Sequence, residues 1–161
     1  PIYDVAGLYN SNIAGLGRDN NSLLDQRQSR SINPDSVLTI GNHVITTTNA
    51  SHPIQMGDLD FFIWGHDGGG ACWSSEEISI TSQETRHLRI AREWKYQEAN
   101  TGGGNFDSLL FRLNVNNPIF DIPDLTTANN ATEYYLYLDA DGNFNSGARA
   151  FPMTQNGNFW E

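Results

Sequence analysis

The chain has 161 residues, a length typical of one folded domain with a single hydrophobic core. Its 9 Lys and Arg residues stand against 19 Asp and Glu residues, which gives a formal net charge of −10 at pH 7. Because such a surface repels phosphate backbones and anionic lipid, and because no apolar run is long enough to insert into a membrane, we expect neither nucleic acid nor membranes as partners.

The first quarter of the chain contains one strand pattern and a long polar stretch. Residues 2–9 predict a first strand. Residues 10–36 lack periodicity and contain Gly and Pro breakers, which predicts a long ordered loop or a set of short edge strands. Within this stretch we expect Arg18, Asp19 and Gln28 to bind backbone groups of the loop, because covered backbone groups need partners.

Several β-rich segments follow in the middle of the chain. Residues 37–40 and 44–48 predict a hairpin, since a Gly-Asn-His turn separates two runs of β-branched residues. Residues 59–64 are apolar on both faces, which is typical of a central strand. The glycine-rich residues 65–70 then predict a loop, after which residues 71–73 are the candidate return strand.

Residues 86–98 fit a strand better than a helix. As a strand, one face carries four apolar side chains and one arginine: Leu88, Ile90, Arg92, Trp94 and Tyr96. The best helical stripe is apolar at only three of five positions. In the strand, Arg92 points inward, and we expect it to meet a carboxylate or backbone carbonyls because a buried guanidinium without a partner is costly.

The last third of the chain predicts further strands and no capped helix. The predicted strands are residues 109–115, 133–138, 149–153 and 158–160. Residues 133–138 are apolar on both faces, so we expect them to lie between two packed layers and to organise the fold. Short strands with Gly and Asn turns predict an all-β fold, namely an antiparallel β-sandwich of jelly-roll or immunoglobulin-like type.

Oxygen-bearing side chains alternate directly after residues 133–138. They are Asp139, Asp141, Asn143 and Asn145, on both sides of Gly142. Such oxygens suit a hard cation, and calcium is the predicted metal. The alternative is a turn in which Asp and Asn bind their own backbone. An EF-hand is excluded because Phe144 and Ala150 stand where that loop needs Gly and Glu.

The sequence contains no convincing catalytic motif. Residues 70–73 (Gly-Ala-Cys-Trp) match the end of a papain-type signature, but Gly69 stands at the place of its first cysteine and the distant downstream histidine is missing. The histidines lack metal-ligand spacing. We therefore expect a protein that is not an enzyme; a glycan-degrading enzyme with paired carboxylates is the third alternative.

The tryptophans suggest binding of carbohydrate. Exposed aromatic rings stack on sugars, and polar neighbours bind the hydroxyl groups. Trp64 and Trp94 lie within strand patterns, which favours core packing, whereas Trp73 lies beside the glycine-rich loop. Trp73 is therefore the candidate ligand-binding ring, with His66 and Asp67 as exposed polar neighbours. A calcium-dependent carbohydrate-binding module that takes polysaccharide is the second functional hypothesis.

Five segments together resemble a known kind of module. They are residues 13–19, 24–29, 61–69, 89–98 and 135–144. The set resembles a β-rich module that recurs in large secreted cell-surface proteins of gliding Gram-negative bacteria, except that Ala91 replaces a usual glycine. The resemblance implies an extracellular adhesion or surface-filament role, with neighbouring modules of the same or identical chains as partners. We expect residues 1–161 to be one such module, excised from a longer secreted protein because the chain begins at Pro1 without Met.

Overall fold

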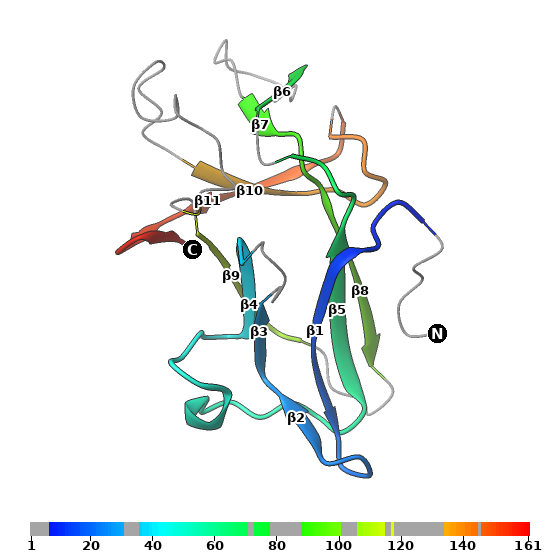
Figure 1. Ribbon diagram of the computed structural model, residues 1–161, viewed down its shortest axis with the longest axis vertical. Helices are drawn as coiled ribbons and strands as arrows, with labels where there is room; N and C mark the ends of the chain where they lie inside the picture. Colours follow the sequence, from blue (N-terminus) through cyan, green and yellow to red (C-terminus); the bar gives the residue numbers. More distant parts are fainter. Residues whose placement is uncertain are drawn as a thin grey trace.

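The computed structural model describes residues 7–30, 36–70, 73–77, 88–100, 106–114, 117, 134–144 and 146–161, with the backbone alone at 73–77 and 88. Over these residues the chain is all-β, with a single 3-10 turn, η1 (Asn49–Ser51), and antiparallel pairing throughout. The predicted fold class is therefore confirmed. Figure 1 shows two main sheets side by side, with a two-stranded ribbon near one end. No helix in the described part is long and apolar enough to cross a membrane.

The first main sheet contains four strands in the order β2-β1-β5-β8. Their bounds are Leu24–Gln26 for β2, Ser11–Asp19 for β1, Asp60–His66 for β5 and Trp94–Asn100 for β8. The predicted central strand is confirmed, because β5 pairs with β1 on one side and with β8 on the other.

The second main sheet has the order β12-β13-β9-β4-β3. Its strands are β12 (Gln155–Asn156), β13 (Phe159–Trp160), β9 (Leu109–Leu113), β4 (Leu38–Asn42) and β3 (Gln28–Arg30). Two further pairs complete the described strands: β10 (Tyr134–Leu138) with β11 (Arg149–Met153), and β6 (Trp73–Glu77) with β7 (Leu88–Ile90). The predicted closing strands near the C-terminal end are thus present.

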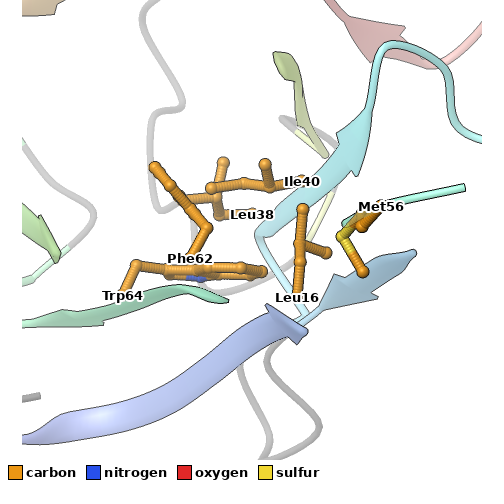
Figure 2. Packing of buried hydrophobic residues seen from close by; sticks show 6 residues of the cluster. All are labelled: Leu16, Leu38, Ile40, Met56, Phe62 and Trp64. Atoms are coloured by element: carbon orange, nitrogen blue, oxygen red, sulfur yellow. The ribbon is translucent and has the colours of Figure 1, made fainter. Parts of the chain in front are cut away.

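The hydrophobic core lies between the two main sheets. Figure 2 shows side chains of β1, β4 and β5 turned toward one another, with Met56 closing one side. The buried members of this cluster are Leu16, Leu38, Ile40, Met56, Phe62 and Trp64. Trp64 is only 1% exposed, so the prediction that it packs in the core is confirmed.

The prediction for residues 10–36 is confirmed in part: the three-residue strands β2 and β3 lie at the edges of their sheets, whereas the nine-residue strand β1 is paired on both sides and is neither a loop nor an edge strand. Residues 1–6 lie outside the described part, and residues 7–10 contain no strand. Gly15 and Gly17 do not break β1. A Cβ atom on Gly17 would come within 2.6 Å of the Phe61 ring, and one on Gly15 within 3.1 Å of the Phe62 carbonyl oxygen. These glycines let β5 pack closely.

The predicted hairpin over residues 37–48 is also wrong. Only its first arm is a strand, and β4 pairs with β3 and β9 instead. The chain turns away at His43, where φ is +64°. Gln28 then holds the second arm: its side-chain oxygen accepts from the Thr46 N–H at 2.6 Å, and its side-chain nitrogen donates to the Thr46 carbonyl at 2.9 Å. A side chain therefore replaces the strand partner that β-propensity alone predicted.

The expected backbone-binding roles of Arg18, Asp19 and Gln28 are confirmed. Arg18 donates from Nη1 to the Met56 carbonyl at 2.8 Å, and Asp19 Oδ1 accepts from the Asn21 N–H at 2.9 Å. Polar side chains thus satisfy backbone groups where the loops cross the sheet ends.

The predicted strand over residues 86–98 is interrupted. Residues 91–93 separate β7 from β8, and these two strands belong to different sheets. Arg92 lies within this interruption: it is 7% exposed, and its Nε donates to the Gly69 carbonyl at 2.8 Å. The predicted carbonyl partner of Arg92 is therefore confirmed, although the continuous strand is not.

The expected central place of residues 133–138 is wrong. Among the described strands, β10 pairs only with β11, and none of its residues is fully buried. Tyr135 is 38% exposed, whereas Tyr134 packs on Trp160 with ring centroids 4.2 Å apart. One face of the segment lines a cleft through Leu136 and Leu138, and the other carries Tyr135 and the partly buried Tyr137.

Candidate functional site

The predicted metal-binding turn follows β10 directly. Asp139 Oδ1 accepts from the N–H groups of Asp141, at 2.9 Å, and Gly142, at 2.8 Å. Asp141 Oδ1 accepts from the Asn143 N–H at 2.8 Å, and Gly142 has a φ of +78°. These hydrogen bonds are the ones expected from the alternative to a calcium site, namely a turn in which Asp side chains bind the backbone of the turn itself.

The turn keeps its negative charge in the folded state. Contact with the Asp141 side chain, followed by the backbone N–H donors, holds the pKa of Asp139 below its ordinary value of 3.8. Asn145, the fourth predicted ligand, lies outside the described residues. Within the described part, no group of three or more His, Cys, Asp or Glu residues is placed to hold a metal ion. Calcium therefore stays a prediction, with Asp139, Asp141 and Asn143 as the described candidates.

The turn approaches a polar cluster formed by the N-terminal segment, β7 and the residues between β7 and β8. The Arg89 guanidinium lies 5.4 Å from the centroid of the Phe144 ring and pairs with Glu93 at 2.9 Å. The Tyr9 hydroxyl donates to Glu93 Oε2 at 2.8 Å. Burial, then this hydrogen bond to a carboxylate, raises the pKa of Tyr9 to about 12. The cluster thus connects the turn to β7 and, through Glu93, to the N-terminal segment.

The two predicted ligand-binding residues at the end of β5 have structural roles. His66 is only 5% exposed, so its expected exposure is wrong. Its Nδ1 accepts from the Gly68 N–H at 2.9 Å, and its Nε2 lies 2.9 Å from the Asn12 amide nitrogen. Asp67 Oδ1 accepts from the Gly69 N–H at 2.8 Å. Both residues therefore shape the glycine-rich loop.

Trp73, the predicted ligand-binding ring, lies in β6, but its side chain is outside the described part. Its role as a ligand-binding residue stays a prediction. Cys72 lies outside the described residues as well.

The described residues form an apolar cleft of about 340 Å³ between β8, β9 and the β10–β11 ribbon. Five aromatic side chains line it: Phe62, Tyr96, Phe106, Phe111 and Phe151. Phe62 is 2% exposed, so the floor of the cleft reaches the core, whereas Tyr96 and Phe151 are 48% and 45% exposed. Leucines from β9 and β10 complete the walls. A volume near the lower end of known small-ligand sites suits one or two apolar groups.

The polar lining of the cleft is acidic. Asp107 and Glu161 contribute carboxylates, and none of the described lining residues is Lys, Arg or His. Glu161 is held in place by Arg112 and, through Oε2, by Asn156 at 2.9 Å. Asp107 has no hydrogen-bond or ion-pair partner in the part of the chain that the structure describes. The cleft therefore offers one unneutralised charge beside an apolar surface.

Sequence analysis missed this cleft because its walls come from strands far apart in the chain. One local signal was present. Leu109, Leu110 and Phe111 are consecutive apolar residues, and all three line the cleft. An apolar run that breaks the alternation of a strand indicates that both of its faces are covered. The alternation in residues 109–115 predicts an apolar face of Leu109, Phe111, Leu113 and Val115, which does not include Leu110.

Comparison with known proteins places the chain in a family. The family model described as "Domain of unknown function (DUF8202)" matches residues 2–160. No curated protein and no solved structure matches the chain.

Proposed function

Since this chain belongs to the DUF8202 family, which matches it over almost its whole length, we propose one function for the entire domain: a non-enzymatic binding module of secreted, surface-exposed proteins. It acts in adhesion or in a surface filament. Its partners are neighbouring modules of the same or identical chains, and it contacts them through the apolar cleft between β8, β9 and the β10–β11 ribbon.

The observation that carries this proposal is the aromatic cleft itself. Two of its rings, Tyr96 and Phe151, are nearly half exposed although both adjoin a closed apolar floor. Exposed rings above an apolar depression lose water favourably when a partner covers them, and aromatic side chains are enriched at such contact sites. The acidic surface keeps the domain from binding unselectively to anionic polymers.

The test measures binding by the immobilised domain in biolayer interferometry. The analytes are the domain itself and a panel of defined polysaccharides. Replacing Phe151 or Tyr96 by Ser should weaken the binding of the true analyte by about tenfold or more, because each removes an exposed ring. The matched control is Leu23→Ser, which removes an apolar side chain that is 89% exposed and lies outside the cleft. Binding that survives both cleft substitutions would refute the proposal.

A calcium-dependent carbohydrate-binding module is the second candidate. It is favoured by the exposed rings of Tyr96 and Phe151, which are suited to stacking on sugars, and by the ionised turn at Asp139. In this case an oligosaccharide in the panel binds, and the binding is lost in EDTA and restored by calcium. Trp73→Ala tests the ring that the sequence singled out.

The calcium prediction is tested separately by thermal unfolding. We expect EDTA to lower the melting temperature and calcium, but not an equal concentration of magnesium, to restore it. Asp141→Ala should abolish the difference. An unchanged melting temperature in EDTA, with the same result for Asp141→Ala, would exclude the site.

A further inference from the structure

The residues that line the apolar cleft favour one chemical class of ligand. We propose that the cleft takes a basic, apolar peptide segment of a neighbouring module, with an aliphatic or aromatic side chain in the cleft and an adjacent ammonium or guanidinium group against Asp107. This inference rests on the proposed binding function and names the ligand class of that same site.

The apolar part of the argument comes from size and depth. The cleft of about 340 Å³ holds one or two side chains, and its floor includes Phe62 at 2% and Met153 at 9% exposure. An apolar side chain that enters it therefore contacts the core directly. Tyr96 stacks on Phe62 with ring centroids 5.1 Å apart and an interplanar angle of 18°, so one wall is held rigid before any ligand arrives.

The charge part of the argument comes from the acidic groups around the cleft. Glu161 is neutralised by Arg112, whereas Asp107 is exposed and has no partner among the described residues. Glu98 adds a second carboxylate nearby, because its Oε1 accepts from the N–H of Phe106, a lining residue, at 3.3 Å. A cationic group placed here gains an uncompensated carboxylate, and an anionic group is repelled.

The net charge of the whole domain also favours a basic ligand. Its net charge of −10 attracts basic segments over the Debye length of about 8–10 Å that applies at moderate salt. An apolar neutral ligand gains nothing from this field. The combination of an apolar depression and an unpaired carboxylate therefore favours a basic apolar peptide over a neutral sugar.

The experiment uses three capped tetrapeptides that differ at one position. Each contains two leucines and one phenylalanine, and the remaining residue is lysine, norleucine or glutamate. Binding to the whole chain is followed by nuclear magnetic resonance titration. We expect the lysine peptide to bind about fivefold more tightly than the norleucine peptide, and the glutamate peptide to bind most weakly.

Asp107→Asn keeps the shape of the side chain and removes its charge, so it should bring the lysine and norleucine peptides to equal affinity. Asp58→Asn is the matched control, because it removes the same charge outside the cleft and keeps an acceptor for the Asn20 N–H. Phe151→Ser should weaken both peptides together. Raising the salt concentration should narrow the lysine preference.

The possible failures are distinguishable. Equal binding of the lysine and norleucine peptides by the unaltered protein, or a lysine preference that Asp107→Asn leaves intact, overturns this inference. Absence of binding by all three peptides overturns it as well. In each case the proposed binding function is tested separately, by the interferometry experiment with Phe151→Ser, Tyr96→Ser and Leu23→Ser.

Discussion

The core between the main sheets and the β10–β11 ribbon are both rich in large apolar residues, yet they differ in burial. Trp64 and Ile40, in the core, are each 1% exposed. In the ribbon, Tyr135 and Phe151 are 38% and 45% exposed, and Met153 alone is buried. Apolar content therefore does not decide which segment is central.

The difference in burial arises from the number of strands and sheets that surround each segment. β5 has a paired strand on each side and a second sheet across its inner face, so its large side chains are enclosed. Within the described part β10 has only β11 as a partner, so the side chains of the ribbon are less enclosed than those of β5.

The sharpest way to break this comparison is to remove one ring from each region. Trp64→Ala should lower the free energy of unfolding by about 3–5 kcal/mol, because it leaves a cavity in a closed core. Phe151→Ala should cost about 1 kcal/mol or less, since the ring is already 45% exposed. Urea unfolding of both variants measures the two values. Equal losses would show that the ribbon belongs to the core.

A second substitution tests how tightly the end of β4 is packed. A Cβ atom on Gly41 would lie 2.2 Å from the Val44 carbonyl oxygen, and the Val44 N–H is itself bonded to the Asn42 carbonyl at 2.8 Å. The backbone cannot move away without losing this turn. Gly41→Ala should therefore lower the free energy of unfolding by about 2–3 kcal/mol.

Gly7→Ala is the control for Gly41→Ala. Nothing lies within 4 Å of a Cβ atom placed on Gly7, so the change should stay within about 0.5 kcal/mol. Both variants are compared by urea unfolding. A mild Gly41→Ala variant would mean that the turn after β4 adapts and is not part of the rigid core.

Local patterns in the sequence predicted what local chemistry decides. Alternation and propensity identified β5, β9 and the closing strands, and the cost of a buried charge correctly required a carbonyl partner for Arg92. The Asp-Gly pattern correctly offered a self-bonded turn at Asp139 as one of two interpretations. These features depend on residues close in the chain or on one strong energetic rule.

The misassigned features depend on partners far away in the chain. Gly15 and Gly17 looked like breakers until Phe61 and Phe62 were placed against them. Val44–Thr48 looked like a strand because Gln28, which takes the place of a strand partner for Thr46, gives no periodic signal. The cleft was missed for the same reason, since its walls are brought together only by the tertiary fold.

A smaller effect is expected where the N-terminal segment meets the residues just before β8, beside the turn of the ribbon. The Tyr9 hydroxyl donates to Glu93, and its folded-state pKa of about 12 lies above the ordinary value of 10.0. The folded state thus favours the protonated phenol, so this contribution is present below pH 10 and is lost as the pH rises toward 12. Tyr9→Phe should cost about 1 kcal/mol at pH 7.

Ultraviolet titration of the tyrosines checks the assignment of Tyr9. The unaltered protein should show one phenol that ionises near pH 12 and is missing in Tyr9→Phe. Burial also raises the pKa of Tyr134 and Tyr137, so the comparison is made by difference between the two proteins. If the phenol that is missing in Tyr9→Phe ionises near pH 10 and not near pH 12, the N-terminal segment does not dock on Glu93.

The smallest effect should come from the exposed turn, and it has a distinct pH dependence. The folded-state pKa of Asp139 lies below 3.8, so the folded state favours the carboxylate. Its stabilisation is present above pH 3.8 and is lost as the pH falls through the lowered pKa. In EDTA, Asp139→Ala should lower the melting temperature slightly at pH 7, less than Tyr9→Phe does. The difference in melting temperature between Asp139→Ala and the unaltered protein should shrink below pH 3.8.

The control is Asp141→Asn, which keeps an acceptor for the Asn143 N–H and should change the melting temperature little. A difference that persists undiminished in acid would show that the Asp139 carboxylate acts through packing and not through its charge.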